Sequence, residues 1–169
     1  MKLLISTVVL LGLFAPSMPR AEIVSSSPAH YVLRIEATSS LSAAKLWQRL
    51  IQPSTWWHPD HTYSGSSENL SLVAKAGGVW REDWEGGSVI HGTVILVKEG
   101  ELLRMDAPFG PLQGLAAHTI WTINITSDGD GSKVVFDEVS NGPPTADLAE
   151  LAQAVHYVKQ EAINRLVAQ

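Results

Sequence analysis

Apolar side chains recur at three- and four-residue steps through residues 143–169. This spacing predicts one long helix with a single apolar stripe, which must pack against another surface. Thr145, after Pro143 and Pro144, is the expected N-cap. The predicted stripe consists of Leu148, Leu151, Val155, Val158, Ala162 and Leu166, while Lys159, Gln160, Arg165 and Gln169 fall mostly off it.

The chain before this helix mostly alternates between apolar and polar residues, as strands do. Thr119, Trp121, Ile123 and Ile125 are expected to face one side of a sheet. Most connections are short, so the strands should pair antiparallel. Strands are predicted at residues 30–36, 70–73, 79–84, 88–97, 102–105, 117–126 and 133–139. A short helix is predicted at 43–51, capped by Ser40 or Ser42, and a second short helix followed by a loop at 54–65.

These elements predict an α+β domain in which a curved antiparallel sheet of about six to seven strands surrounds a long C-terminal helix. Two short helices follow the first strand. Because sheets twist, the sheet need not touch the helix along its whole length. A gap between the sheet and the helix would form an apolar pocket.

The first 21 residues have the pattern of a signal peptide. Lys2 precedes an apolar run at residues 3–15, which is shorter than the ~20 residues of a membrane span. Cleavage is expected at Ala21 or near Ala15–Ser17, and an uncleaved anchor is the alternative. Residues 22–29 are expected to be a linker and residues 30–169 the domain. The predicted protein is exported, periplasmic or secreted, with no stable membrane insertion after cleavage.

Charge and cysteine content exclude several partners and chemistries. Without residues 1–21 the chain keeps 10 basic and 17 acidic residues, a formal charge of −7. Nucleic acid and anionic membranes are therefore not expected as partners. The absence of cysteine excludes a disulfide, a thiolate nucleophile and a cysteine metal site. The oligomeric state is not predicted.

Glu82 and His91 are the leading polar candidates. Pairing of their two strands symmetrically about Gly86-Gly87 would place them opposite each other, where a carboxylate could orient an imidazole. A structural pair without chemistry is the alternative. No catalytic residue is assigned beyond these two candidates.

His58 and His61 lie three residues apart, with Asp60 between them. They are weak candidates for metal ligands, because the strong zinc pattern places two histidines four apart on a helix with a glutamate. A pair of loop histidines at a pocket mouth is favoured instead, and no metal or cofactor is expected.

Six tryptophans are available to a core or a pocket wall, and each buries a large apolar area while keeping one donor. Trp47 and Trp121 fit the core. Glu138 alternates with Val134 and Phe136, so it is expected to point inward. The predicted ligand-contacting residues are Trp56, Trp57, His58, Trp80, Glu82, Trp84, His91, Trp121 and Glu138.

Several motifs resemble the START-related helix-grip superfamily, also called SRPBCC, across residues 31–167. The nearer resemblance is to the branch described as polyketide-cyclase-like or as relatives of the activator of heat-shock-protein ATPase. The resemblance implies the helix-grip fold. It implies function only weakly, because one fold hosts many activities. The matching motifs are Ala44–Trp47, Trp56-Trp57, Tyr63–Gly65, Gly77–Glu82, Val89–Val94 and Phe109–Gln113.

The expected function is non-covalent binding of a small hydrophobic molecule between the sheet and the C-terminal helix. The alternative is a cyclase- or hydrolase-type enzyme that uses Glu82 and His91 as its acid–base pair. A protein-interaction module is a third possibility, and it would require a large exposed apolar patch.

Overall fold

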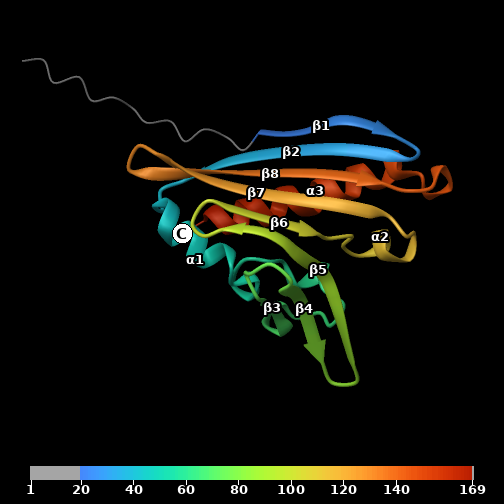
Figure 1. The fold of residues 1–169 in the computed structure, drawn as a ribbon, viewed down its shortest axis with the longest axis horizontal. Helices are drawn as coiled ribbons and strands as arrows, with labels where there is room; N and C mark the ends of the chain where they lie inside the picture. Colours follow the sequence, from blue (N-terminus) through green and yellow to red (C-terminus); the bar gives the residue numbers. More distant parts are fainter. Residues whose placement is uncertain (1–19, 169) are drawn as a thin grey trace, which may run out of the picture.

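The computed structural model describes residues 20–168. The predicted signal peptide lies outside these residues, except for its last two positions. The described chain forms one eight-stranded antiparallel sheet in the order β1-β2-β8-β7-β6-β5-β4-β3 (Figure 1). The strands are β1 (Arg20–Ser27), β2 (His30–Ser39), β3 (Leu70–Leu72), β4 (Val79–Trp84), β5 (Gly87–Lys98), β6 (Leu102–Asp106), β7 (His118–Asp128) and β8 (Gly131–Asn141).

The edge strand β1 corrects the expectation of a linker at residues 22–29. Its residues pair with β2, for example Ile23 with Leu33 and Ala21 with Ile35. Ala21 and Ile23 are half-buried while Glu22 and Val24 are exposed, which is the alternation of a strand. The serines at 25–27 suggested a linker by composition, but a backbone ladder does not depend on the side chains. β1 raises the strand count above the predicted six to seven.

The helical segments after β2 also differ from the prediction. The first helix, α1 (Ala43–Leu50), has Ser42 at its N-cap position, but the side chain makes no capping hydrogen bond. The second expected helix is replaced by short 3-10 turns. Pro53 and Pro59 each begin such a turn, and a residue before proline is disfavoured in helical geometry. The short elements are η1 (Pro53–Thr55), η2 (Pro59–His61), η3 (Ser67–Asn69) and α2 (Pro111–Gly114).

The long helix α3 (Leu148–Val167) begins later than predicted. Pro144–Ala146 form the 3-10 turn η4, so Thr145 lies inside this turn and is not the cap. Asp147 takes the N-cap position with φ 46°, a left-handed conformation that aspartate tolerates better than most residues. No helix within residues 20–168 is long and apolar enough to cross a membrane.

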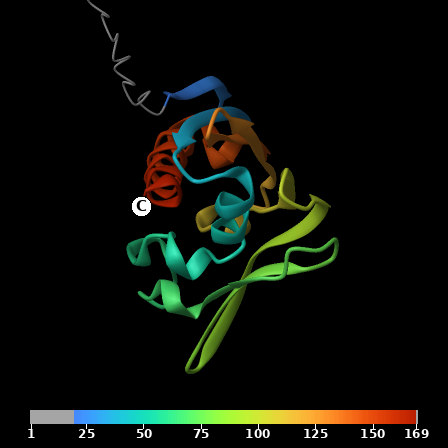
Figure 2. The ribbon, with the colours of Figure 1, turned by 90° about the vertical axis from the view of Figure 1, so that its left-hand side faces the viewer.

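α3 packs on β2, β1 and β8, while α1 packs on β7 and β8. The sheet curls around these helices, and the β4–β5 hairpin extends away from the body (Figures 1 and 2). The side of α3 facing the core carries Leu148, Ala152, Lys159, Ala162, Ile163 and Leu166. Lys159 was expected off the buried stripe, so its position is a correction. The predicted stripe residues Leu151, Val155 and Val158 are only half-buried.

Candidate functional site

A cavity of about 350 Å³ lies between α3, the sheet and two connecting segments. α3 supplies one wall, β5 and β8 supply polar groups, and the segments at 57–63 and 109–112 supply the rest. The half-buried stripe residues of α3 belong to this wall, which explains why they are not fully covered. The lining residues are Trp57, His61, Thr62, Tyr63, His91, Phe109, Gly110, Pro111, Leu112, Glu138, Leu151, Ala154, Val155, Val158 and Lys159.

The tryptophans divide between this wall and the core. Trp57 lines the cavity beside Phe109, with ring centroids 5.4 Å apart. Trp56, Trp80 and Trp121 are fully buried and do not line the cavity. Their rings pack on one another, as aromatic cores do, with Trp56 and Trp80 edge to face at 5.6 Å. Trp56, Trp80 and Trp121 were predicted to contact the ligand, but in the structure they lie in the core and not in the cavity lining.

Trp84 also lies outside the cavity lining. It is the last residue of β4, directly before the turn to β5, and its ring is parallel to that of Tyr63, with centroids 6.5 Å apart. Tyr63 itself lines the cavity and has 56% of its surface exposed. Trp84 therefore supports a cavity residue from behind.

Lys159 and Glu138 form a buried ion pair at the cavity wall. Lys159 Nζ lies 3.1 Å from Glu138 Oε2, and both side chains are 3% exposed. The pair is close but poorly aligned, because neither atom makes a hydrogen bond to any described residue. Glu138 Oε1 accepts a hydrogen bond of 2.6 Å from the hydroxyl of Tyr31. The inward orientation predicted for Glu138 is confirmed.

The surroundings of Lys159 are mostly aromatic. Its Nζ lies 2.9 Å from the centroid of Trp121 and 4.5 Å from that of Phe109. Burial lowers the pKa of Lys159 to about 8, although the charge of Glu138 opposes this shift. Burial, followed by the charge and hydrogen bond of Glu138, raises the pKa of Tyr31. The wall therefore carries the amine of Lys159 beside the carboxyl group of Glu138 and the hydroxyl of Tyr31.

Glu82 and His91 meet as predicted, but in a different register. The hairpin turn is Glu85-Gly86, with Gly86 at φ 85°, so Glu82 pairs with Val89. A β-bulge follows, in which His91 is the extra residue between the partners of Arg81 and Trp80. His91 lies diagonal to Glu82 on the same face, and its Nε2 is 2.9 Å from Glu82 Oε2.

Glu82 is fully buried and well hydrogen-bonded. It accepts from the backbone N–H groups of Tyr63 at 3.1 Å and Ser64 at 2.6 Å, besides its contact with His91. Burial alone would raise the pKa of Glu82, but the hydrogen bonds from Ser64, Tyr63 and His91 outweigh it and lower the pKa. Glu82 is thus ionised and holds the 63–64 segment against β4.

His91, which belongs to the cavity lining, retains an unused acceptor. Burial lowers its pKa, and the hydrogen bond and charge of Glu82 only partly oppose this. A neutral imidazole beside an ionised carboxylate carries its proton on Nε2, which leaves Nδ1 as an acceptor. Nδ1 is buried and has no hydrogen-bond partner among residues 20–168. The ring stacks on Phe109, with centroids 5.2 Å apart.

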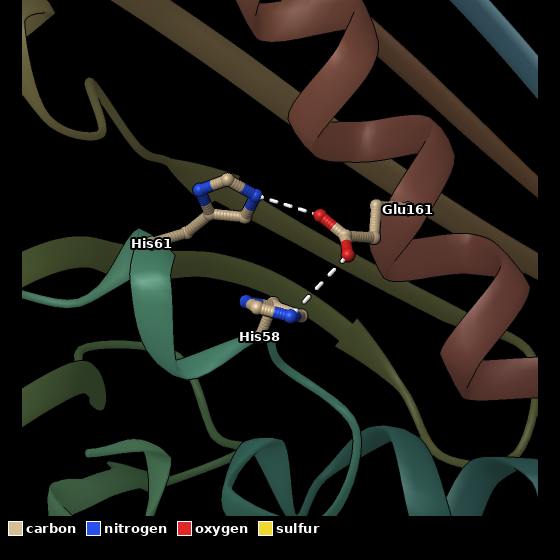
Figure 3. Close-up of side chains that lie close together, drawn as sticks. All are labelled: His58, His61 and Glu161. Atoms are coloured by element: carbon tan, nitrogen blue, oxygen red, sulfur yellow. Dashed lines mark hydrogen bonds and ion pairs between the residues drawn. The ribbon is translucent and has the colours of Figure 1, made fainter. Parts of the chain in front are cut away.

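His58 and His61 lie beside the cavity, and only His61 lines it. Both rings point toward Glu161 of α3, which the sequence did not single out (Figure 3). Pro59 starts a 3-10 turn between them, so the two side chains converge without a regular helix.

The sequence reasoning missed several residues of the site. The prediction from apolar spacing places Lys159 mostly off the stripe, and it does not identify Tyr31, Tyr63 or Phe109 as polar or aromatic contacts. Lys159 is four residues after Val155 and three before Ala162. This spacing places it on the same face of the helix as the apolar stripe, and it is the signal in the sequence that could have predicted its burial. No local signal pairs Glu161 with His61, because 100 residues separate them.

The fold is shared with solved bacterial structures, although no family model and no curated protein matches the chain. CalU16 from Micromonospora echinospora matches with a TM-score of 0.58 and 11% identity, over 89% of this chain and 81% of its own. An uncharacterised protein from Rhizobium leguminosarum matches with a TM-score of 0.56 and 17% identity, over 89% and 98%. A protein from Rhodobacter sphaeroides matches with a TM-score of 0.56 and 19% identity, over 88% and 96%. These likenesses show the helix-grip-like fold alone.

Proposed function

We propose that the protein binds a small hydrophobic molecule with one polar end in the cavity between α3 and the sheet. The volume of about 350 Å³ is within the range of small-molecule sites. Trp57, Phe109 and Val155 offer apolar contact, and burial of the ligand's apolar surface supplies the driving force, roughly 25 cal/mol per Å² before association costs.

The observation that carries this proposal is the set of incompletely satisfied polar groups among the lining residues. Lys159 Nζ and Glu138 Oε2 are paired with each other at 3.1 Å but make no aligned hydrogen bond, and His91 Nδ1 has no hydrogen-bond partner within residues 20–168. Buried polar atoms without partners are uncommon and costly. A ligand bearing both a donor and an acceptor at its polar end, such as a hydroxyl, satisfies groups of this kind. The three residues therefore orient the bound molecule.

Native and denaturing mass spectra of the protein, purified without denaturation, test the proposal. We expect a defined extra mass in the native spectrum that disappears on denaturation. Val155→Phe fills the cavity and should abolish this mass. Gln153→Phe adds the same ring to an exposed position of α3 outside the cavity lining and should retain it.

If wild type and Gln153→Phe carry no ligand, a panel of small apolar alcohols and ketones is screened by thermal shift. The proposal predicts that at least one compound stabilises the wild type but not Val155→Phe. If no compound does so, the proposal is contradicted. Equal loss in both variants would show that the added ring, and not the cavity, is responsible.

A second candidate is an enzyme of cyclase or hydrolase type in which His91 acts as a general base. The observation that favours it is the neutral ring of His91, oriented by Glu82 and with Nδ1 free. On any ligand that is turned over, His91→Ala should remove the bell-shaped pH–rate profile while ligand binding persists. Unchanged turnover in His91→Ala would leave binding as the function. The third expectation, an interaction module, stays a prediction.

We also propose, on the motifs, that the chain belongs to the polyketide-cyclase-like branch of the SRPBCC superfamily and is exported. The helix-grip-like fold is compatible with this membership. Cell fractionation with N-terminal sequencing of the mature protein tests export. Recovery in the cytosol with an intact N-terminus would contradict it.

A further inference from the structure

Two histidines and a glutamate converge at the edge of the cavity. His61 Nε2 lies 2.8 Å from Glu161 Oε2, and His58 Nε2 lies 3.5 Å from Glu161 Oε1 (Figure 3). One donor atom from each of the three residues lies within 4.8 Å of the other two. The histidines come from the segment around η2 and the glutamate from α3, so the cluster exists only in the folded chain.

The spacing suits a single metal ion. Two ligands at about 2.1 Å from a tetrahedral ion lie about 3.4 Å apart. The separations of 2.8 and 3.5 Å, which run to the two different oxygens of Glu161, lie on either side of this value, and the separations within the set extend up to 4.8 Å. The side chains are 21–28% exposed, so an ion can reach them while the surrounding protein limits their movement. Rotation of the side chains would be needed to bring the three atoms around one ion.

Asp60 can support His58 as a metal ligand. His58 Nδ1 accepts a hydrogen bond of 3.1 Å from the backbone N–H of Asp60, which places the proton of the neutral ring on Nε2. A metal at Nε2 requires this proton to move to Nδ1. The hydrogen bond from the Asp60 N–H would then be lost. The carboxylate of Asp60 lies 3.9 Å from Nδ1, so it would have to move closer before it could accept a hydrogen bond from the moved proton. Carboxylates commonly orient metal-bound histidines in this way.

We propose that His58, His61 and Glu161 bind a divalent transition-metal ion. Imidazole nitrogen and carboxylate oxygen together suit zinc and its neighbours in the first transition row, whereas magnesium and calcium prefer oxygen ligands. Three protein ligands leave at least one coordination position open. His61 also lines the cavity, so the metal lies beside the space proposed for the hydrophobic ligand. The metal site does not depend on that ligand.

Titration of the untagged, chelator-treated full chain with Zn²⁺, followed by calorimetry, tests the site. We expect one ion per chain, with at least about tenfold weaker binding in His61→Ala and in Glu161→Gln. His118→Ala is the matched control, because His118 also lies near a carboxylate, at 3.6 Å from Asp106, but is 66% exposed and separate from the cluster. It should bind like wild type. Asp60→Asn should weaken binding by about tenfold, as loss of an outer-shell partner does.

Co²⁺ absorption in the visible range provides a second measurement. A ligand-field spectrum in wild type that is lost in Glu161→Gln, an isosteric change, supports the site even if His61→Ala fails to fold. Far-UV circular dichroism in chelator confirms that each variant is folded. No Zn²⁺ binding by wild type, binding that survives both ligand substitutions, or equal loss in His118→Ala would overturn the proposal. Each outcome is independent of whether a hydrophobic ligand is carried.

Discussion

Two buried glutamates, one behind the cavity and one on its wall, are satisfied to very different degrees. Glu82 receives hydrogen bonds from Tyr63, Ser64 and His91. Glu138 receives one from Tyr31, and its second oxygen faces Lys159 at 3.1 Å without an aligned hydrogen bond. Both carboxylates are almost completely shielded from solvent.

The difference indicates different roles for the two groups. A buried polar network with every member satisfied makes the local structure rigid and unique. Glu82 therefore positions the 63–64 segment and the ring of His91. The incompletely satisfied Glu138–Lys159 pair retains hydrogen-bonding capacity at the cavity. The Glu82 carboxylate is structural support, whereas the Glu138 carboxylate is the one that the proposed ligand would meet.

Breaking the pair at the cavity should have the largest effect on stability. Glu138→Leu leaves Lys159 buried without its counter-charge, which typically costs about 3–5 kcal/mol. Urea unfolding at pH 7 measures the loss. The double variant Glu138→Leu with Lys159→Met removes both charges and should recover much of it. A cost below about 1 kcal/mol for the single change would contradict the pairing of the two charges.

Removing the charge of Glu82 should have the next largest effect. Glu82→Gln weakens three charge-assisted hydrogen bonds. It also points the new amide N–H group at groups that are themselves donors. Together these effects should lower the free energy of unfolding by about 2–3 kcal/mol at pH 7. The folded-state pKa of Glu82 is lowered, so its contribution is present above the ordinary value of 4.5 and disappears as the pH falls through the folded value. Unfolding free energies of wild type should decline in this acidic range more steeply than those of Glu82→Gln.

Asp83 provides the control for this acidic range. It neighbours Glu82 on β4, and its pKa is also lowered, by Arg81, but it is exposed. Asp83→Asn should retain nearly the full acid dependence of wild type. If Asp83→Asn flattens the pH profile as much as Glu82→Gln does, burial of Glu82 is not the cause.

The third and smallest effect is expected in alkaline solution. The pKa of Lys159 falls from 10.5 to about 8 on folding. Between these values the unfolded chain binds more protons than the folded one, so stability should rise with pH, by at most about 1.4 kcal/mol per unit. Unfolding measured from pH 8 to 9.5, below the ordinary tyrosine range, should show this slope in wild type. Lys159→Met should not show this rise of stability with pH. If wild type and Lys159→Met show the same slope, another titrating group causes it.

The sequence predicted the class of fold because periodicity depends on local residues. The alternation of Trp121 and Ile123 on β7 and the inward position of Glu138 are confirmed. The edge strand β1 was not predicted. Its serine-rich sequence is typical of a linker, whereas the hydrogen bonds that pair it with β2 are made by the backbone and leave no signal in the residue types. The start of α3 was misplaced, because Thr145 has the chemistry of a cap but lies in a 3-10 turn.

The candidate site could be predicted only in part. The Glu82–His91 contact is confirmed, although the assumed register was wrong, because the bulge at His91 compensates for the shifted turn. Trp80 and Trp121 are core residues, and an aromatic residue type alone does not distinguish core from wall. Lys159 and Glu161 were missed, because their partners lie on distant segments whose placement depends on the whole fold.

The pairing of β2 with β8 has a kinetic consequence. His30 faces Asn141 across this ladder, and 111 residues separate them in the sequence. Closing so long a loop is entropically unfavourable, so folding should be slow compared with helical proteins of this size. Until α3 covers the sheet, apolar strand faces remain open to other molecules. The chain should therefore refold most efficiently at low protein concentration.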